Sequence, residues 1–166
     1  IGGTGDSSSE IAHLLNRSGI RARSVANIEA SLWTKFLLAA SLGGVGLAFG
    51  LPAGRVLHEP AAAAMLAAAM EEVRSLAHAR GASLPPGIVA TTLSFVANFP
   101  ADATTSLQRD VMLGRASEYD FLPGAVLRLG RELGVSTPCF DHIDRLASRS
   151  AEGSSFWHPS PGSGSG

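Results

Sequence analysis

Residues Asn27 to Phe49 read NIEASLWTKFLLAASLGGVGLAF, and this apolar stretch is the strongest structural signal in the chain. Its apolar residues follow helical spacing, and Lys35 is the only charged residue between Glu29 and Arg55. On a helix, the residues three or four positions from Lys35 are Ser31, Leu32, Leu38 and Ala39. The stretch therefore predicts a helix that carries one ammonium group on a largely apolar wall.

Two interpretations of Lys35 are open at this point. Desolvation disfavours the charged form of a lysine, so a lysine held against an apolar wall gives up its proton more readily and can act as an acid. Alternatively, the methylene groups of Lys35 lie along the wall while the ammonium stays in water. Spacing alone favours this second interpretation, because most lysines on amphipathic helices behave this way.

Length and composition predict one globular domain that binds no nucleic acid. The chain has 166 residues, 16% of them charged, and a net charge of -1. It therefore lacks the excess of positive charge with which proteins bind nucleic acid. The single cysteine, Cys139, excludes an internal disulfide and makes the reducing cytoplasm the expected compartment. The chain begins at Ile1 without a signal-peptide pattern, and we expect it to be a piece of a longer protein.

A membrane-spanning interpretation is weighed against a buried helix. Residues 36–53 are uncharged and contain a GxxxG pattern from Gly46 to Gly50. However, several glycines and Pro52 interrupt the stretch, and its flanks lack aromatic anchors and a basic cluster. We therefore expect no membrane association, and we predict a buried helix that breaks near Gly43 and Gly44.

Before this helix, the sequence predicts a strand end and turn at 1–6, a helix ending at Ser18 and a short strand at 20–25. Gly3 and Gly5 half match the dinucleotide-binding fingerprint GxGxxG. The third glycine is replaced by Ser8, and no βαβ unit follows. We therefore reject a phosphate-binding loop at this point.

After the apolar stretch, turn and capping residues delimit further predicted helices at 60–80, 86–98, 104–115, 118–133 and 138–150. The fourth is expected to bend or break at Pro123. The second half of the 60–80 helix carries a buried stripe of Leu66, Met70, Val73 and Ala77. Its polar residues Glu71, Glu72 and His78 lack a second histidine at ligand spacing, so we expect a solvated face and no metal site.

The sum is an all-α domain. Residues 151–166 are rich in Ser, Gly and Pro, and we expect them to be disordered. An enzyme half-site and a helical interaction module fit these patterns equally well.

An ordered set of motifs resembles the C-terminal domain of the ketopantoate reductase (2-dehydropantoate 2-reductase) family, with matching spacing over about residues 20–147. The set comprises Asn27-Ile-Glu-x-x-Leu-Trp33-x-Lys35-Phe, Glu72-Val with Gly81 closing that helix, Ser106-Leu-Gln-Arg-Asp110, Gly114-Arg-x-Ser-Glu118, Gly124-Ala-Val-x-Arg-Leu-Gly130 and Gly134-Val-Ser-Thr-Pro138. The resemblance implies the 6-phosphogluconate dehydrogenase C-terminal-like helical fold. Residues 1–24 then form a β/α remnant of the N-terminal nucleotide-binding Rossmann domain, 25–150 the catalytic domain and 151–166 a tail.

The resemblance also implies an NADPH-dependent reduction of a 2-oxo acid to a 2-hydroxy acid, as in pantothenate biosynthesis. It places the general acid on Lys35, its partner carboxylate on Glu118 and a substrate-contacting serine on Ser106, with Asp110 as a structural residue. NADPH would be held mainly by the N-terminal domain. The implied partner is a small-molecule 2-oxo acid, and a homodimer is left open.

The chain departs from the family pattern near the lysine. Asparagines that contact substrate and cofactor commonly stand one and two turns after it, where this chain has Ala39 and Gly43, and Pro123 replaces a further asparagine. Small residues there are expected to widen the pocket and to weaken selection of ketopantoate. The alternative function is a helical binding or dimerisation module that is inactive as an isolated fragment.

Overall fold

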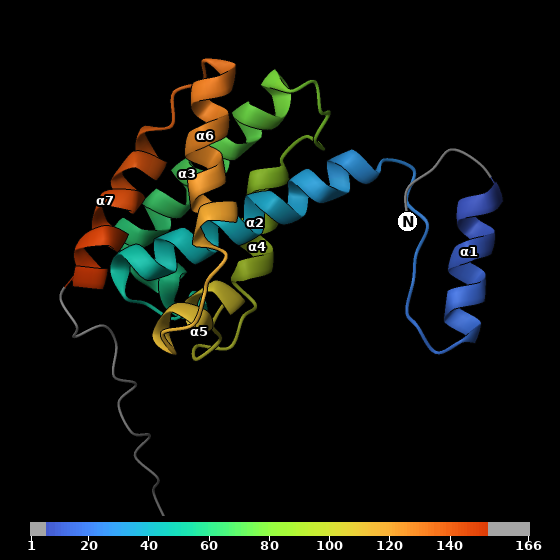
Figure 1. Cartoon of the computed structure of the whole chain (residues 1–166), viewed down its shortest axis with the longest axis horizontal. Helices are drawn as coiled ribbons and strands as arrows, with labels where there is room; N and C mark the ends of the chain where they lie inside the picture. The colour runs from blue at the N-terminus through green and yellow to red at the C-terminus, as the bar shows by residue number, and fades with distance from the viewer. Residues whose placement is uncertain (1–5, 153–166) are drawn as a thin grey trace, which may run out of the picture.

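Helix α2 (Ile28–Phe49) runs through the centre of the fold, and the later helices pack around its C-terminal half (Figure 1). The structure is a computed structural model that describes residues 6–152. The other elements are α1 (Asp6–Arg17), η1 (Ala53–His58), α3 (Pro60–Ala79), α4 (Ile88–Val96), α5 (Ser106–Met112), η2 (Tyr119–Phe121), α6 (Pro123–Leu133) and α7 (Pro138–Glu152). The predicted all-α class is confirmed for these residues.

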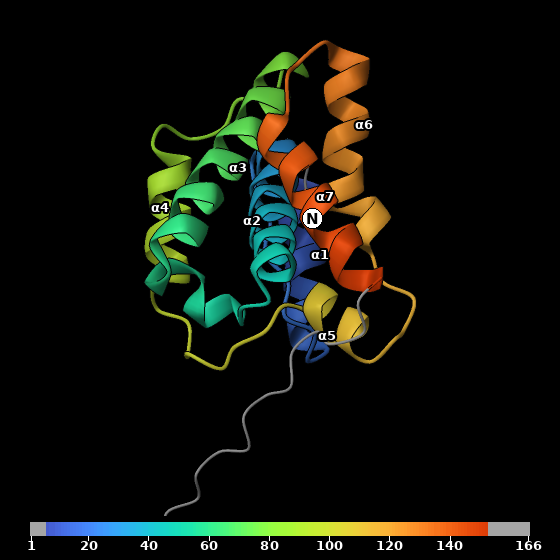
Figure 2. The same cartoon turned by 90° about the vertical axis from the view of Figure 1, so that its left-hand side faces the viewer.

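Helix α2 is enclosed by its neighbours on several sides. It contacts α3 and α7 most extensively, and it also contacts α5, α6 and η1. Figure 2 shows α3 and α4 to one side of α2 and α6 and α7 to the other. By length and composition α2 could cross a membrane, but half of its most apolar window is buried inside the protein. This packing matches the predicted buried core helix.

The predicted break of α2 at Gly43 and Gly44 is wrong, because the helix continues to Phe49. An added Cβ at Gly43 would lie 2.9 Å from the Cδ2 atom of Leu107, and one at Gly44 would lie 3.1 Å from the Cγ2 atom of Ile143. The glycines therefore let α5 and α7 approach the α2 backbone closely. Tertiary packing outweighs the low helix propensity of glycine here.

The predicted strand at 20–25 is also wrong, because within the described residues only Val25 forms an isolated bridge. The side chain of Asn16 instead bonds the backbone of this segment: its Nδ2 donates to the carbonyl oxygen of Ala22, and its Oδ1 accepts from the Ala22 N–H. This segment folds back on α1, which stands apart from the other helices (Figure 1). The expected strand end and turn at 1–6 and the expected disordered tail at 151–166 lie outside the described residues except at their inner ends. There, Asp6 begins α1 and residues 151–152 belong to α7, so both expected boundaries are wrong by one or two residues.

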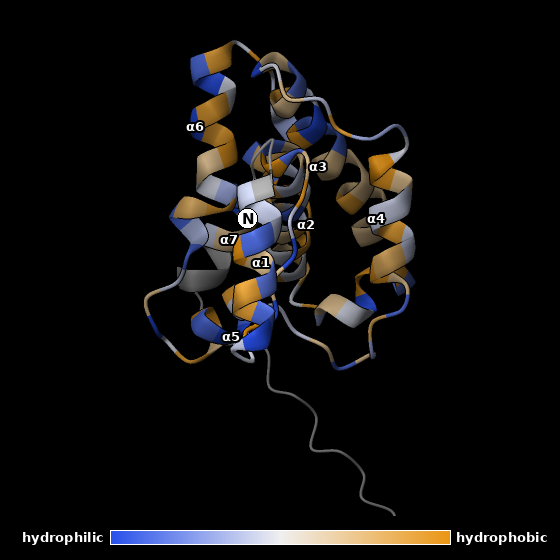
Figure 3. Cartoon of the chain, turned by 90° about the vertical axis from the view of Figure 1, so that its right-hand side faces the viewer, coloured by the Kyte–Doolittle hydropathy of each residue, from blue (hydrophilic) through white to orange (hydrophobic). Residues whose placement is uncertain are grey.

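Helix α1 keeps apolar side chains at the surface. Ile11 is 48% exposed and Leu14 is 60% exposed, whereas Ala12 and Ser8 are buried. Figure 3 shows hydrophobic and hydrophilic residues side by side on this helix. The strongly amphipathic sequence of α1 thus has its apolar face only partly covered.

The predicted buried stripe of α3 is confirmed, since Leu66, Met70, Val73 and Ala77 are fully buried. The prediction that Pro123 bends or breaks the 118–133 helix is confirmed, and the structure has a break there. Residues 119–121 form a single 3₁₀ turn, and α6 starts at Pro123. Proline lacks an N–H and has its φ preset for the first helical position, so it begins a helix here rather than bending one.

The predicted solvated face of α3 is wrong for Glu72. Its carboxylate accepts hydrogen bonds from the backbone N–H groups of Cys139 (2.7 Å) and Phe140 (3.1 Å), in the first turn of α7. These N–H groups have no partner within their own helix. Glu72 therefore caps α7 from another element, and burial raises the pKa of its carboxyl although the two hydrogen bonds oppose this.

We expect Glu72→Gln to lower the free energy of unfolding by about 1 kcal/mol, because both oxygens of a carboxyl group can accept a hydrogen bond whether it is neutral or charged, whereas glutamine has one acceptor oxygen and its NH₂ group would face the second N–H. The raised pKa means that the folded state binds the proton more tightly than the unfolded state. The contribution of Glu72 is then fully present below its ordinary pKa and is lost as the pH rises through the folded-state pKa. The stability difference between wild type and variant should therefore shrink with rising pH.

Urea unfolding of both proteins between pH 4 and pH 8 measures this difference. Glu71→Gln is the matched control, since Glu71 neighbours Glu72 but is exposed and pairs only with Arg74. A difference that grows with pH would show that the α7 dipole and the two N–H groups outweigh the burial of Glu72.

Candidate active site

Lys35 lies on the part of α2 that extends beyond the other helices. Full burial of α2 begins only at Leu37, and Figure 1 shows the N-terminal part of the helix projecting from the bundle. Lys35 is exposed, and its neighbour Leu32 is 60% exposed. The apolar wall predicted around the ammonium is therefore open to solvent in this chain. The Lys35 side chain makes no hydrogen bond or ion pair with the described residues.

Helix α5 presents Ser106 at its first position. Thr105 caps the helix by accepting from the Gln108 N–H, while the Gln108 side chain accepts from the Thr105 N–H at 3.0 Å. The Nε2 of Gln108 also donates to the Leu51 carbonyl oxygen at 2.6 Å, just after the end of α2. This capping box ties α5 to α2 and leaves the Ser106 side chain exposed.

Glu118 precedes the 3₁₀ turn η2, and its side chain is exposed. The backbone carbonyl of Glu118 accepts from the N–H groups of Phe121 and Leu122. The Tyr119 hydroxyl donates to Asp144 Oδ1 on α7 at 3.1 Å, and burial together with that carboxylate raises the pKa of Tyr119 above its usual range. The hydrogen bond between Tyr119 and Asp144 thus holds the turn after Glu118 against α7.

Helices α5 and α6 pack closely against α2, the helix that carries Lys35, at the α2 glycines. The Cγ of Pro123, which follows the Glu118 turn, would lie 3.3 Å from a Cβ added at Gly44, and Gln108 of α5 packs closely on Gly46. Lys35 therefore lies on α2 and Ser106 on α5, which packs against α2, whereas Glu118 precedes η2, which packs against α6. No hydrogen bond or ion pair joins their side chains within the described part of the chain.

The expectation that Gly43 widens a substrate pocket is wrong. Gly43 is buried, and a Cβ there would meet Leu107 at 2.9 Å and the Thr105 hydroxyl at 3.6 Å. The space of an asparagine side chain is filled by α5. Ala39, one turn earlier, is half-buried.

Sequence reasoning missed the residues that position these elements, namely Gln108 and the Tyr119–Asp144 pair. A capping-box pattern at Thr105 and Gln108 was the available signal for the first. Nothing in the sequence links Tyr119 to a residue of another helix. Asp110, expected to be structural, lies half-buried on α5. No group of three or more His, Cys, Asp or Glu that could hold a metal ion occurs in residues 6–152.

The family described as "Ketopantoate reductase PanE/ApbA C terminal" matches residues 27–149. The 2-dehydropantoate 2-reductase of Pyrobaculum aerophilum is 34% identical over 130 residues, which are 78% of this chain and 46% of that protein. The 2-dehydropantoate 2-reductase of Mycobacterium tuberculosis is 27% identical over 153 residues, or 90% of this chain and 50% of that protein. The chain spans about half the length of these curated relatives.

Solved structures share the fold. The PanE/ApbA family ketopantoate reductase of Ralstonia eutropha matches with a TM-score of 0.79 at 24% identity, over 91% of this chain and 50% of that chain. A dimeric ketopantoate reductase of Staphylococcus aureus matches with a TM-score of 0.76 at 19% identity, over 90% and 52%. A complex of D-mandelate dehydrogenase with NADH matches with a TM-score of 0.77 at 23% identity, again over 90% and 52%.

The helical fold is the one that the solved ketopantoate reductase structures share over about half of their chains. The chain belongs to the ketopantoate reductase family, and its residues 27–149 correspond to the family's C-terminal domain.

Proposed function

We propose that this chain supplies the proton-donating half of an NADPH-dependent 2-oxo acid reductase, with Lys35 as the general acid. The observation that carries the proposal is the family match, which spans Lys35, Ser106 and Glu118 in one continuous domain. The open surroundings of Lys35 support it as well, because its ammonium can be reached by a substrate.

The chemistry follows from the groups themselves. Hydride supplied by a nicotinamide cofactor builds negative charge on the carbonyl oxygen of a 2-oxo acid. The Lys35 ammonium stabilises that charge and then donates a proton to the oxygen. Glu118 orients the ammonium or accepts a hydrogen bond from a substrate hydroxyl. Ser106 donates a hydrogen bond to the substrate carboxylate.

The residues described here do not fit the role of holding a dinucleotide. The near-match at Gly3 and Gly5 lacks the third glycine of the fingerprint, and the described residues contain no strand-to-helix turn for a diphosphate. We propose that the nucleotide-binding domain of the complete protein binds NADPH. We also propose that the complete protein lies in the cytoplasm. A homodimer is proposed by analogy with the dimeric Staphylococcus aureus relative.

The proposal predicts a sharp difference between two proteins. The purified 166-residue chain should oxidise no NADPH with ketopantoate, because it cannot hold the diphosphate. The complete protein, in which the chain is joined to a nucleotide-binding domain, should reduce ketopantoate or another 2-oxo acid. Absorbance of NADPH at 340 nm measures both.

The two assays distinguish a reductase from a binding module. Turnover by the chain alone would contradict the assignment of NADPH binding to another domain. A complete protein that folds and binds NADPH, yet reduces none of a panel of 2-oxo acids, would favour the helical binding or dimerisation module.

A further inference from the structure

A cavity of about 610 Å³ lies between the C-terminal half of α3, residues 82–87 and the first turns of α4. This volume is in the range of pockets that bind small organic molecules. Lys35, Ser106 and Glu118 do not line it. The cavity is therefore separate from the candidate active site, and what it binds is independent of the proposed reaction.

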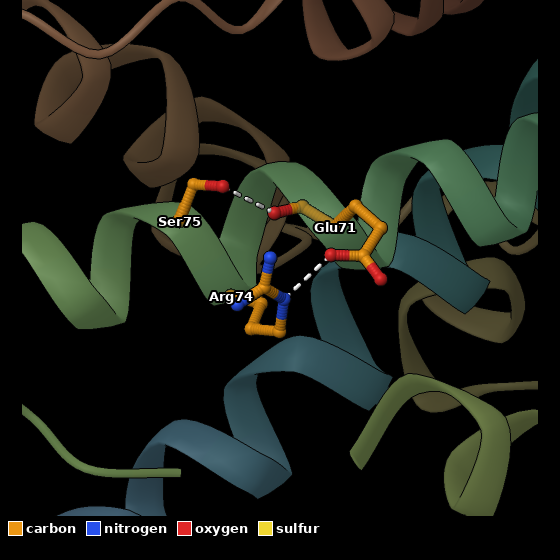
Figure 4. A network of polar contacts seen from close by, with 3 residues as sticks. All are labelled: Glu71, Arg74 and Ser75. Carbon is orange, nitrogen blue, oxygen red and sulfur yellow. Dashed lines mark hydrogen bonds and ion pairs between the residues drawn. The ribbon is translucent and has the colours of Figure 1, made fainter. Parts of the chain in front are cut away.

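One wall of the cavity is polar and comes from α3. Glu71, Arg74 and His78 stand at spacings that place them on one face of that helix. Figure 4 shows the Nε of Arg74 donating to the Glu71 carboxylate, at 2.5 Å, while the Ser75 hydroxyl donates to the Glu71 carbonyl oxygen. The two Nη groups of Arg74 bond no acceptor among the described residues, so one edge of the guanidinium is left for a ligand.

The opposite wall is apolar. Leu84 and Leu93 are half-buried and offer hydrocarbon surface to a ligand, whereas Ile88 and Val89 are only 7% and 9% exposed and offer little. The amides of Val89 and Ala90, in the first turn of α4, donate to no backbone acceptor, and the positive end of the α4 dipole adds to the preference of the cavity for negative charge. The cavity thus combines a hydrocarbon surface with a cationic edge.

We propose that this cavity binds an amphipathic organic monoanion, whose carboxylate pairs with the Nη edge of Arg74 and whose hydrocarbon body lies on Leu84 and Leu93. The carboxylate matches the planar, two-pronged edge of a guanidinium. Arg74 carries the only permanent positive charge on this wall and shares it with Glu71 through Nε, so its free Nη edge can take one carboxylate, but a second negative charge on the ligand would have no permanent cation to pair with. A phosphate dianion would be repelled by Glu71.

The test is a titration of the ¹⁵N-labelled chain with decanoate, below its micelle concentration, followed by NMR. We expect saturable shifts confined to residues 71–93, with a Kd on the order of 1 mM or tighter. Decanol and decylamine, which share the chain length, should bind at least about tenfold more weakly, or roughly 1.4 kcal/mol. If decanol binds as tightly as decanoate, the proposed role of the ligand's charge is wrong. Decyl phosphate is titrated as a dianionic comparison, and tighter binding of decyl phosphate than of decanoate would overturn the proposed preference for a monoanion.

Two matched variants test the residues. Arg74→Gln should weaken decanoate at least about tenfold, because it removes the only guanidinium on the α3 wall of the cavity. Glu71→Gln should tighten it, because the competing carboxylate is gone. Both side chains are about half exposed, so both variants should keep the wild-type spectrum outside residues 71–93. Unchanged affinity in Arg74→Gln, or shifts elsewhere on the surface, would overturn the site.

Discussion

Replacing Lys35 by alanine in the complete protein should lower kcat by at least about a hundredfold, the scale of lost general-acid catalysis. Lys35 is the only lysine among these 166 residues, so no other lysine of this chain can replace it. Its side chain is exposed and bonds no described residue, so its removal should leave the fold intact. Steady-state kinetics with NADPH and the best 2-oxo acid substrate measure the change.

Two controls keep this result specific. Glu29→Gln alters another exposed charge on the projecting part of α2 and should change kcat by less than about twofold. Lys35→Arg keeps the charge but is a poor proton donor, so it should recover substrate binding and little of kcat. A near-normal rate in Lys35→Ala would leave Lys35 as an ordinary solvated lysine.

Gly54→Ala should destabilise the protein by about 3 kcal/mol or more, the upper range for overpacking. A Cβ at Gly54 would lie 1.8 Å from the carbonyl oxygen of Pro100 and 3.0 Å from the Cα of Ala101. Both are backbone atoms, which cannot turn aside as a flexible side chain does. The Gly54 N–H also donates to the Ala103 carbonyl oxygen at 3.2 Å, so moving the loop would break this bond.

Thermal unfolding followed by circular dichroism measures the effect, which should be a fall in Tm of roughly 10 °C. Gly124→Ala is the matched control, because its Cβ would meet its nearest neighbours at 3.4 to 3.6 Å, an ordinary contact distance. Alanine is also the better helix former there, so this variant should be neutral or slightly stabilising. Equal Tm values for both variants would show that residues 100–103 can move away from the added Cβ without lowering the stability of the fold.

The local signals in the sequence were sufficient for most helices. Pro60 and Gly81 delimit α3, and Gly134 ends α6 with a φ of 65°. Such signals act through the backbone of the residue itself, so no other part of the chain is needed to interpret them. The helical spacing of Leu66 and Met70 likewise indicated the face of α3 that is buried.

The same local signals failed where a distant partner decides the outcome. Gly43 and Gly44 weaken a helix in isolation, yet Leu107 and Ile143 pack onto them and the helix continues. Glu72 looked like a solvated carboxylate, but it caps α7 across a separation of 67 residues. The polar cavity wall formed by Glu71 and Arg74 has the same origin, since α4 comes to face α3 only in the folded chain.

The sequence by itself determined the all-α class, most helix ends and the family of the chain, while the roles of Lys35, Ser106 and Glu118 stay predictions from the resemblance. These depend on local backbone preferences and on an ordered set of motifs. Only the tertiary structure decided that α2 is continuous, that α5 covers Gly43 and that Lys35 is open to solvent. Those features arise from contacts between residues far apart in the chain, which no local pattern encodes.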